Sequence, residues 1–142
     1  MEQNVKNHGR MVPGYHYVLS LFLLTGLIGS IINLCQSNGT AAYYSASLIT
    51  LLFLVAVLIA AFTRTFALKA QDRAIKAEEG LRYFILTGKA LPTELRIRQI
   101  IGLRFASDEE FPKLVEKALK ENLSEKEIKQ AIRNWKADHY RV

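Results

Sequence analysis

The sequence predicts an all-α protein: a two-helix transmembrane hairpin whose second span continues into a long cytoplasmic helix, followed by a small C-terminal helical unit. The first observation behind this prediction is that residues 11–63 contain no Lys, Arg, Asp or Glu. A soluble domain rarely leaves 53 consecutive residues uncharged, because its outer face must be hydrated. The second observation is that residues 64–142 carry 17 basic and 12 acidic side chains, with apolar residues at helical spacing.

The two spans are expected at about residues 15–35 and 41–62, within a hairpin of residues 15–66. Each is near 21 residues long, which is enough to cross about 30 Å of hydrocarbon at 1.5 Å per residue. The link between them, residues 36–40, is polar and contains the turn-forming pair Asn38-Gly39. A link this short predicts that the two spans are antiparallel neighbours.

Basic residues flank the hairpin and predict its orientation. Lys6 and Arg10 precede the first span, in an N-terminal segment of residues 1–14, and four more basic residues follow the second span. The turn has none, so the positive-inside rule places both termini in the cytoplasm. Two alternatives fit less well. A cleaved signal peptide needs small residues at its cleavage site, and Ile32-Asn33-Leu34 does not provide them. A buried hairpin of a soluble bundle is disfavoured by two adjacent apolar runs that are each long enough to span a membrane.

Inside the spans, polar groups are few and small. His16, near the edge, is the one ionisable residue in the hydrocarbon, whereas transporters normally place charged residues at depth. Gly26, Gly29 and Ser30 form a small-residue face that would let helix backbones approach closely. That face predicts packing of the two spans, or of two copies of the chain.

A juxtamembrane helix is expected over residues 67–90. A narrow apolar stripe alternates spacings of four and three residues, and Gly88 follows it as a helix stop; its members are Ala70, Ala74, Ala77, Leu81 and Phe84. A stripe this narrow needs a partner. The partner is either the same helix of a second copy or the C-terminal unit of the same chain.

The small cytoplasmic unit is expected over residues 91–142. Pro92 breaks the preceding helix, and a short helix is expected from Glu94 to about Arg104, although the alternation at 95–98 also fits a strand. Two capping boxes then predict two helices, Ser107 with Glu110 and Ser124 with Glu127. The apolar face of the first helix consists of Phe111, Leu114, Val115, Ala118 and Leu119, and that of the second of Ile128, Ala131, Ile132 and Trp135.

The candidate binding residues form a basic cluster after the second span: Arg64, Lys69, Arg73 and Lys76. Such a cluster can bind anionic lipid head groups, although the same charges are already required to set topology. The sequence has no phosphate-binding loop, paired-histidine motif or nucleophile elbow. Cys35 is the only cysteine, which excludes an internal disulfide and a cysteine-based zinc site. We therefore expect no enzyme activity, no catalytic residues, no cofactor and no metal.

Nucleic acid is not an expected partner. Arg96, Arg98 and Arg104 lie near the two capped helices, which could suggest a helix–turn–helix module. However, acidic residues are interspersed on the same helices, which is typical of a solvated surface.

Several strings in the chain resemble a bacterial membrane family catalogued as domain of unknown function 6526. They are Gln3 to Arg10 (QNVKNHGR), Ala70 to Ile75 (AQDRAI), Glu78 to Arg82 (EEGLR), Leu86 to Lys89 (LTGK), Arg98 to Glu110 (RQIIGLRFASDEE) and Asn134 to Arg141 (NWKADHYR). The resemblance implies a small multi-pass protein of the bacterial inner membrane and no catalytic residue. The expected function is a non-enzymatic membrane-anchored interaction or scaffold protein, with membrane lipid and a homo-oligomer or larger membrane complex as partners. The alternatives are an accessory subunit of a transport or envelope complex, and binding of anionic lipid or nucleic acid by the basic part.

Overall fold

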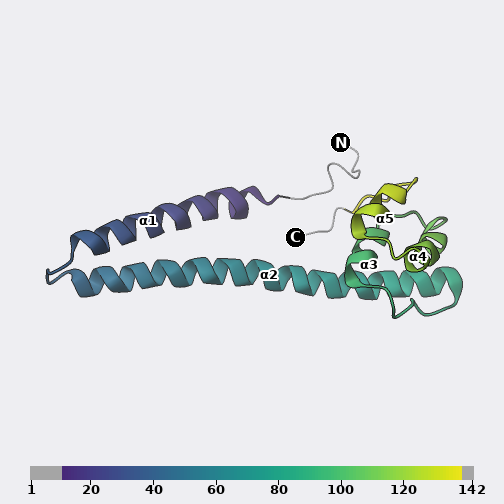
Figure 1. Ribbon diagram of the computed structural model, residues 1–142, viewed down its shortest axis with the longest axis horizontal. Helices are drawn as coiled ribbons and strands as arrows, with labels where there is room; N and C mark the ends of the chain where they lie inside the picture. The colour runs from purple at the N-terminus through teal and green to yellow at the C-terminus, as the bar shows by residue number, and fades with distance from the viewer. Residues whose placement is uncertain (1–10, 139–142) are drawn as a thin grey trace. The chain divides into compact units, whose positions relative to one another are not determined.

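A computed structural model describes residues 11–138 of the chain (Figure 1). The predicted all-α fold is confirmed: a π-helical turn η1 (Gly14–Leu19) leads directly into α1 (Ser20–Gln36), and α2 (Tyr43–Thr87), α3 (Ile97–Leu103), α4 (Phe111–Lys120) and α5 (Glu125–Ala131) follow. The chain divides into two compact units, Met11–Ala67 and a second one that begins at Leu68. Lys6 and Arg10, on which part of the orientation prediction depends, lie outside the described residues.

The first unit contains an antiparallel helical pair. Gly14–Gln36 and Tyr43–Thr87 are both long and apolar enough to cross a membrane, and the turn between them has Gly39 at φ +76°. Among the 17 residues of α1 only Ser30 is buried, and the large apolar side chains around it are mostly exposed. This exposure is unlike a core helix of a soluble bundle, which would bury its apolar face.

Small residues hold this pair together near the turn. The Thr50 hydroxyl donates a hydrogen bond to the Ser30 carbonyl at 3.1 Å, and a Cβ on Gly26 would lie 2.1 Å from the Phe53 ring. Gly26 and Ser30 therefore belong to the interhelical contact that the sequence predicts. Gly29 does not, since a Cβ there would meet nothing within 4 Å.

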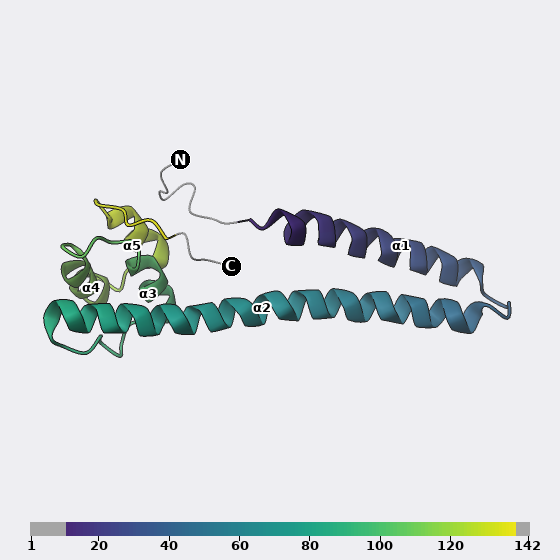
Figure 2. The same ribbon diagram turned by 180° about the vertical axis from the view of Figure 1, so that it is seen from behind.

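Helix α2 runs for 45 residues without a break. The predicted stop is confirmed: Gly88 adopts φ +68°, and its N–H donates to the Phe84 carbonyl at 2.8 Å. Such a left-handed residue is favourable for glycine and costly for other residues. The last part of α2 lies in the second unit, where α3, α4 and α5 gather beside it (Figure 2).

Helix α3 is shorter than predicted, because it begins at Ile97 rather than at Glu94. Residues 92–95 form a turn, in which the Leu95 N–H donates to the Pro92 carbonyl, and this turn buries the Leu95 side chain. The amide of Gln99 then accepts a hydrogen bond from the Arg96 N–H at 2.9 Å and donates one to the Leu123 carbonyl at 2.9 Å. The alternative strand at 95–98 is not formed.

The two capping boxes have different outcomes. At α5 the box is complete: the Glu127 N–H donates to the Ser124 hydroxyl, and the Ser124 N–H donates to the Glu127 carboxylate. At α4 the Glu110 carboxylate accepts the Ser107 N–H at 3.4 Å, but the helix itself begins later, at Phe111. Residues 108–110 form a turn that leads into it.

The chain leaves helical geometry after Ala131, so the prediction that α5 extends to Trp135 is wrong. The Glu110 carboxylate accepts hydrogen bonds from the backbone N–H groups of Arg133 and Asn134, which draws this segment away from the helix axis. Ala106 and Trp135 then form an isolated antiparallel bridge. The Trp135 ring stacks on Phe105 with centroids 4.5 Å apart.

The core of the second unit uses a different face of α2 from the predicted stripe. Ile75 and Tyr83 are the apolar α2 residues buried in it. They are joined there by residues from the part of the chain that follows α2: Leu95, Ile100, Leu103, Ala106, Phe111, Leu114, Val115, Ala118 and Ile128. By contrast, Ala70, Ala74, Ala77, Leu81 and Phe84 are all exposed. Gly102 allows α3 and α5 to approach closely, because a Cβ there would lie 3.1 Å from the Glu125 carbonyl oxygen.

Candidate functional site

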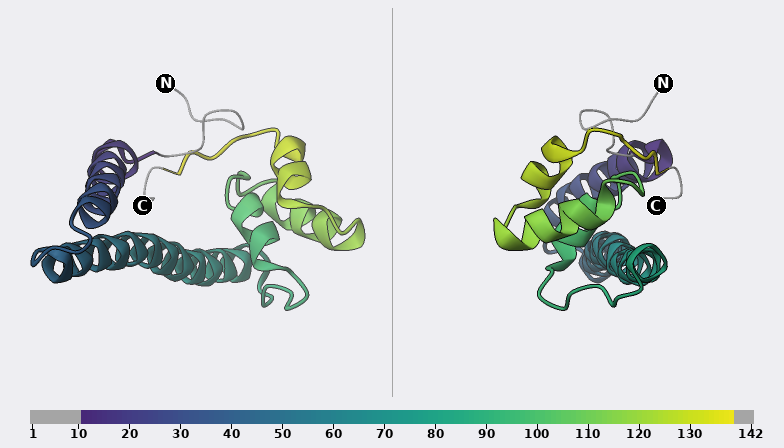
Figure 3. Two further views of the ribbon diagram at one scale, coloured as in Figure 1. Left: turned by 60° about the vertical axis from the view of Figure 1, so that its left-hand side comes forward. Right: turned by 90° about the vertical axis from the view of Figure 1, so that its right-hand side faces the viewer.

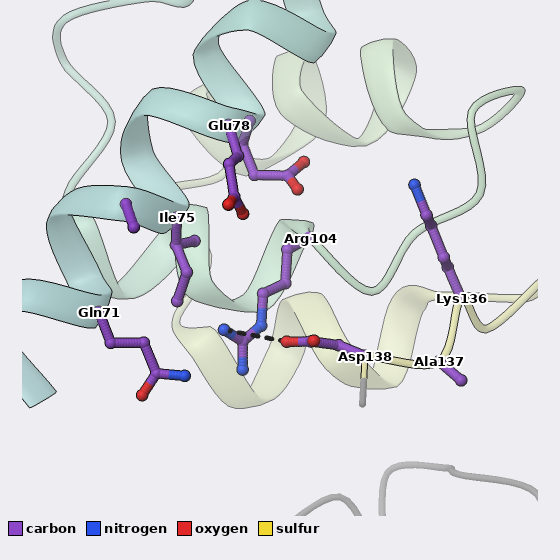
Figure 4. Close-up of a pocket in the computed structure, with 9 residues that line it drawn as sticks. Gln71, Ile75, Glu78, Arg104, Lys136, Ala137 and Asp138 are labelled. Carbon is purple, nitrogen blue, oxygen red and sulfur yellow. Dashed lines mark ion pairs between the residues drawn. The ribbon is translucent and has the colours of Figure 1, made fainter. Parts of the chain in front are cut away.

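The second unit contains a charged hollow between α2 and the segment that follows α5 (Figure 4). Its volume is about 420 Å³, and it is lined by Gln71, Ala74, Ile75, Glu78, Glu79, Arg104, Lys136, Ala137 and Asp138. Three carboxylates and two cations thus share one concave surface. A surface of mixed sign favours binding of a polar or zwitterionic group over an apolar ligand.

Arg104 lies at the centre of this hollow. Its guanidinium is 3.3 Å from the Asp138 carboxylate and lies over the Phe105 ring, 4.6 Å from the centroid. The Ala106–Trp135 bridge holds the opposite wall, because the Lys136 N–H donates to the Phe105 carbonyl at 2.7 Å. The position of Lys136 and Asp138 therefore depends on the same backbone pairing that ends α5.

Next to the hollow, Arg82 connects α2 to the C-terminal helices. Its guanidinium donates to the carboxylate of Glu79 at 3.0 Å and to that of Asp108 at 2.7 Å. It also donates to the Ala106 carbonyl at 2.6 Å, and it lies 4.4 Å above the centroid of the Phe111 ring. One side chain on α2 thus contacts the α3–α4 connection, the start of α4 and its own helix.

The two carboxylates at Arg82 have pKa values shifted in opposite directions. Burial raises the pKa of Glu79 above its ordinary value, and the charge of Arg82 opposes this shift only in part. The hydrogen bond from Arg82 lowers the pKa of the exposed Asp108 below its ordinary value. Of these two carboxylates, Glu79 therefore binds a proton more readily, and it lies on the wall of the hollow.

Arg104 and Arg82 are held by carboxylates and aromatic rings, an arrangement that positions charges for binding. Across the described part of the chain, no group of three or more His, Cys, Asp or Glu side chains could hold a metal ion.

A second hollow lies in the first unit, between α1 and α2. It has a volume of about 510 Å³ and mostly apolar walls from residues such as Leu23, Leu27 and Val57, with Tyr15 and Arg64 among its lining residues. The Tyr15 hydroxyl donates to the Ala60 carbonyl across this gap. Arg64 of the predicted basic cluster thus borders this hollow.

The structure separates the predicted basic cluster into two parts. Lys69, Arg73 and Lys76 follow one another at i, i+4 and i+7 on α2, so they share one face of that helix. Arg64 points elsewhere, because five residues at about 100° each rotate it roughly 140° from Lys69. The prediction that these residues contact anionic lipid stays a prediction.

The sequence did not predict the connected set of charged side chains formed by Arg82, Glu79, Arg104 and Asp138. Glu78 and Arg82 have the i,i+4 spacing of a helical ion pair, but Arg82 pairs instead with Glu79 at i,i+3. Glu79 is spaced four residues from both Ile75 and Tyr83, and this spacing could have indicated that it shares their buried face.

Comparison with known protein families gives a match over the whole chain. Residues 1–142 match the family described as "Family of unknown function (DUF6526)". No curated protein and no solved structure matches the chain. Because the match covers the full length given, the chain belongs to the DUF6526 family, whose function is unknown.

Proposed function

We propose that this chain is a membrane-anchored interaction protein of the bacterial inner membrane, with both termini in the cytoplasm. In this proposal the helical pair of Met11–Ala67 spans the bilayer and the unit that begins at Leu68 lies on the cytoplasmic side. The chain works by presenting surfaces to partners, without catalysis.

The continuity of α2 supports this proposal most directly. Its first part belongs to the apolar pair, and its last part contributes Ile75, Glu79 and Tyr83 to the core of a folded, highly charged unit. An unbroken helix therefore tethers that unit to the candidate spans. The positive charge of the residues that follow the second span agrees with a cytoplasmic location.

The test begins with fractionation of cells that express the full chain. The protein is expected to stay in the pellet after a carbonate wash and to enter solution only with detergent. Chemical crosslinking in native membranes is then expected to give discrete higher-mass products. A chain that stays in the supernatant would contradict the anchoring, and a chain that gives only monomers with no co-purifying protein would contradict the interaction role.

Binding of anionic lipid is a second candidate function, favoured by the shared face of Lys69, Arg73 and Lys76. All three side chains are exposed, and no ion pair is formed by them among residues 11–138. Each cation near an anionic surface contributes about 1 kcal/mol. Purified protein reconstituted at low salt is expected to enrich anionic over zwitterionic lipid, and the triple Ala variant is expected to lose this enrichment.

A further inference from the structure

The exposed stripe on α2, which consists of Ala70, Ala74, Ala77, Leu81 and Phe84, has no partner among the described residues. Leu81 is 61 % exposed and Phe84 54 %, and the neighbouring Ile85 is 72 % exposed. The helices α3, α4 and α5 lie on one side of α2 (Figure 3), where they cover Ile75, Glu79 and Tyr83. A contiguous apolar surface of this kind usually marks an interaction site.

The spacing of the stripe is that of a coiled-coil seam. Its alternation of three and four residues places Ala74 and Leu81 at a positions and Ala70, Ala77 and Phe84 at d positions of a heptad. Arg73 then falls at a g position and Glu78 at the next e position. In a parallel two-stranded coiled coil, the g residue of one helix lies beside the following e residue of the other.

We infer that the stripe binds the stripe of a second copy of this chain, as a parallel two-stranded contact. Two-fold symmetry makes Arg73 of each copy face Glu78 of the other, so one pair of residues supplies two complementary ion pairs. Both side chains are exposed, and Glu78 lies where the stripe borders the charged hollow that it also lines. The inference rests on the proposed function, since two copies anchored in the same membrane with the same orientation present α2 in parallel.

The composition of the seam fits close packing at one end and apolar burial at the other. Three alanines allow the two backbones to approach closely, because the interaxial distance of packed helices depends on the side chains at the contact. Leu81 and Phe84 then bury larger surfaces at the far end. A seam of about two heptads is too short to pair firmly in solution, but confinement to one membrane raises the effective concentration of the partner.

Site-specific crosslinking of the full chain in isolated membranes tests this contact. In a Cys35→Ser background, Ala77→Cys places a thiol at a central d position, and Lys76→Cys places one on an exposed neighbour outside the stripe. Mild oxidation is expected to give a disulfide-linked dimer with Ala77→Cys and little dimer with Lys76→Cys. Equal crosslinking at both positions would show random collision and would overturn the inference.

Charge reversal tests the predicted register. In the Ala77→Cys background, Arg73→Glu and Glu78→Arg each place like charges opposite one another, and the crosslinking yield is expected to fall by a factor of about 5–30. The double reversal restores complementary pairs and is expected to restore the yield. A double variant that remains as poor as the single variants would overturn the proposed pairing.

The same samples separate this inference from the proposed function. Protein that fractionates with the membrane but does not crosslink through Ala77→Cys contradicts the dimer and leaves the anchoring intact. Protein that does not fractionate with the membrane contradicts the proposed function itself.

Discussion

Removal of the Arg82 side chain is expected to destabilise the second unit strongly. The pair that it forms with Glu79 is nearly buried, since the two side chains are 12 % and 11 % exposed. Deleting one partner of a buried pair costs about 3–5 kcal/mol, because the remaining charge keeps its desolvation penalty. The pair with Asp108 adds little, since that carboxylate is 57 % exposed and exposed pairs contribute at most about 1 kcal/mol. We therefore expect Arg82→Ala to lower the free energy of unfolding by about 3 kcal/mol.

The chain provides its own probe for this measurement. Trp135 is the only tryptophan, and its ring stacks on Phe105 within the second unit. Urea unfolding of the full protein in mild detergent, followed by tryptophan fluorescence, therefore reports the stability of that unit. Arg98→Ala is the matched control, because Arg98 is 77 % exposed and 3.5 Å from its partner Glu125. The control is expected to change stability by less than about 0.5 kcal/mol.

A double variant identifies the source of the loss. If the cost of Arg82→Ala arises mainly from the carboxylate left without its partner, adding Glu79→Gln replaces that charge with a neutral amide and is expected to recover about 1–2 kcal/mol. A loss for Arg82→Ala no larger than that for Arg98→Ala would refute the view that Arg82 holds the unit together. A double variant no more stable than Arg82→Ala would refute the explanation by a buried charge.

Three further predictions concern other parts of the chain. The pKa of Glu79 is raised above 4.5 in the folded state, so the folded protein binds a proton that the unfolded chain has lost, and the stability of the wild-type protein falls as pH rises between these two pKa values. Glu79→Gln is expected to remove this pH dependence. A stability difference between the two proteins that does not vary with pH would contradict the assignment to Glu79. Gly26→Ala is expected to destabilise the helical pair by about 1–3 kcal/mol through overpacking against Phe53. The measurement is the temperature above which the detergent-solubilised protein no longer elutes as a single peak in size-exclusion chromatography, and this temperature is expected to fall. Gly29→Ala is the control and is expected to have no effect, so equal effects of the two variants would refute the contact. If both termini are cytoplasmic, a membrane-impermeant maleimide is expected to label a cysteine replacing Asn38 of the turn in intact spheroplasts, in a Cys35→Ser background. A cysteine replacing Arg98 in the same background is expected to stay unlabelled, and the reverse labelling pattern would show the opposite topology.

Local chemistry in the sequence predicted most of the elements. The absence of charge over residues 11–63 predicted the helical pair, and the Asn-Gly turn, Gly88 and the Ser124–Glu127 box predicted its link and two helix boundaries. Each of these signals depends on residues close together in the sequence, so it can be recognised without a structure. The C-terminal end of α5 could not be predicted from the local sequence, because it depends on Glu110. The carboxylate of Glu110 accepts hydrogen bonds from residues 133 and 134, more than 20 positions away.

The sequence pattern also did not predict which face of α2 is buried. Apolar periodicity selected the stripe from Ala70 to Phe84, whereas the core uses Ile75 and Tyr83 with the charged Glu79 between them. A charged residue counts toward the solvent face in such a pattern, and only the partner Arg82, with its contacts to Asp108 and the Ala106 carbonyl, makes its burial acceptable.

The two faces of α2 consequently follow different physical rules. The buried face is polar in part and is stabilised by specific hydrogen bonds from Arg82, which fix one arrangement of the C-terminal helices. The exposed stripe from Ala70 to Phe84 is apolar, and apolar burial is non-directional. In the proposed dimer, the stripe supplies apolar area, and Arg73 with Glu78 of the second copy fixes the register. The apolar pattern that failed to identify the core of the unit is therefore the pattern on which the proposed contact between two copies rests.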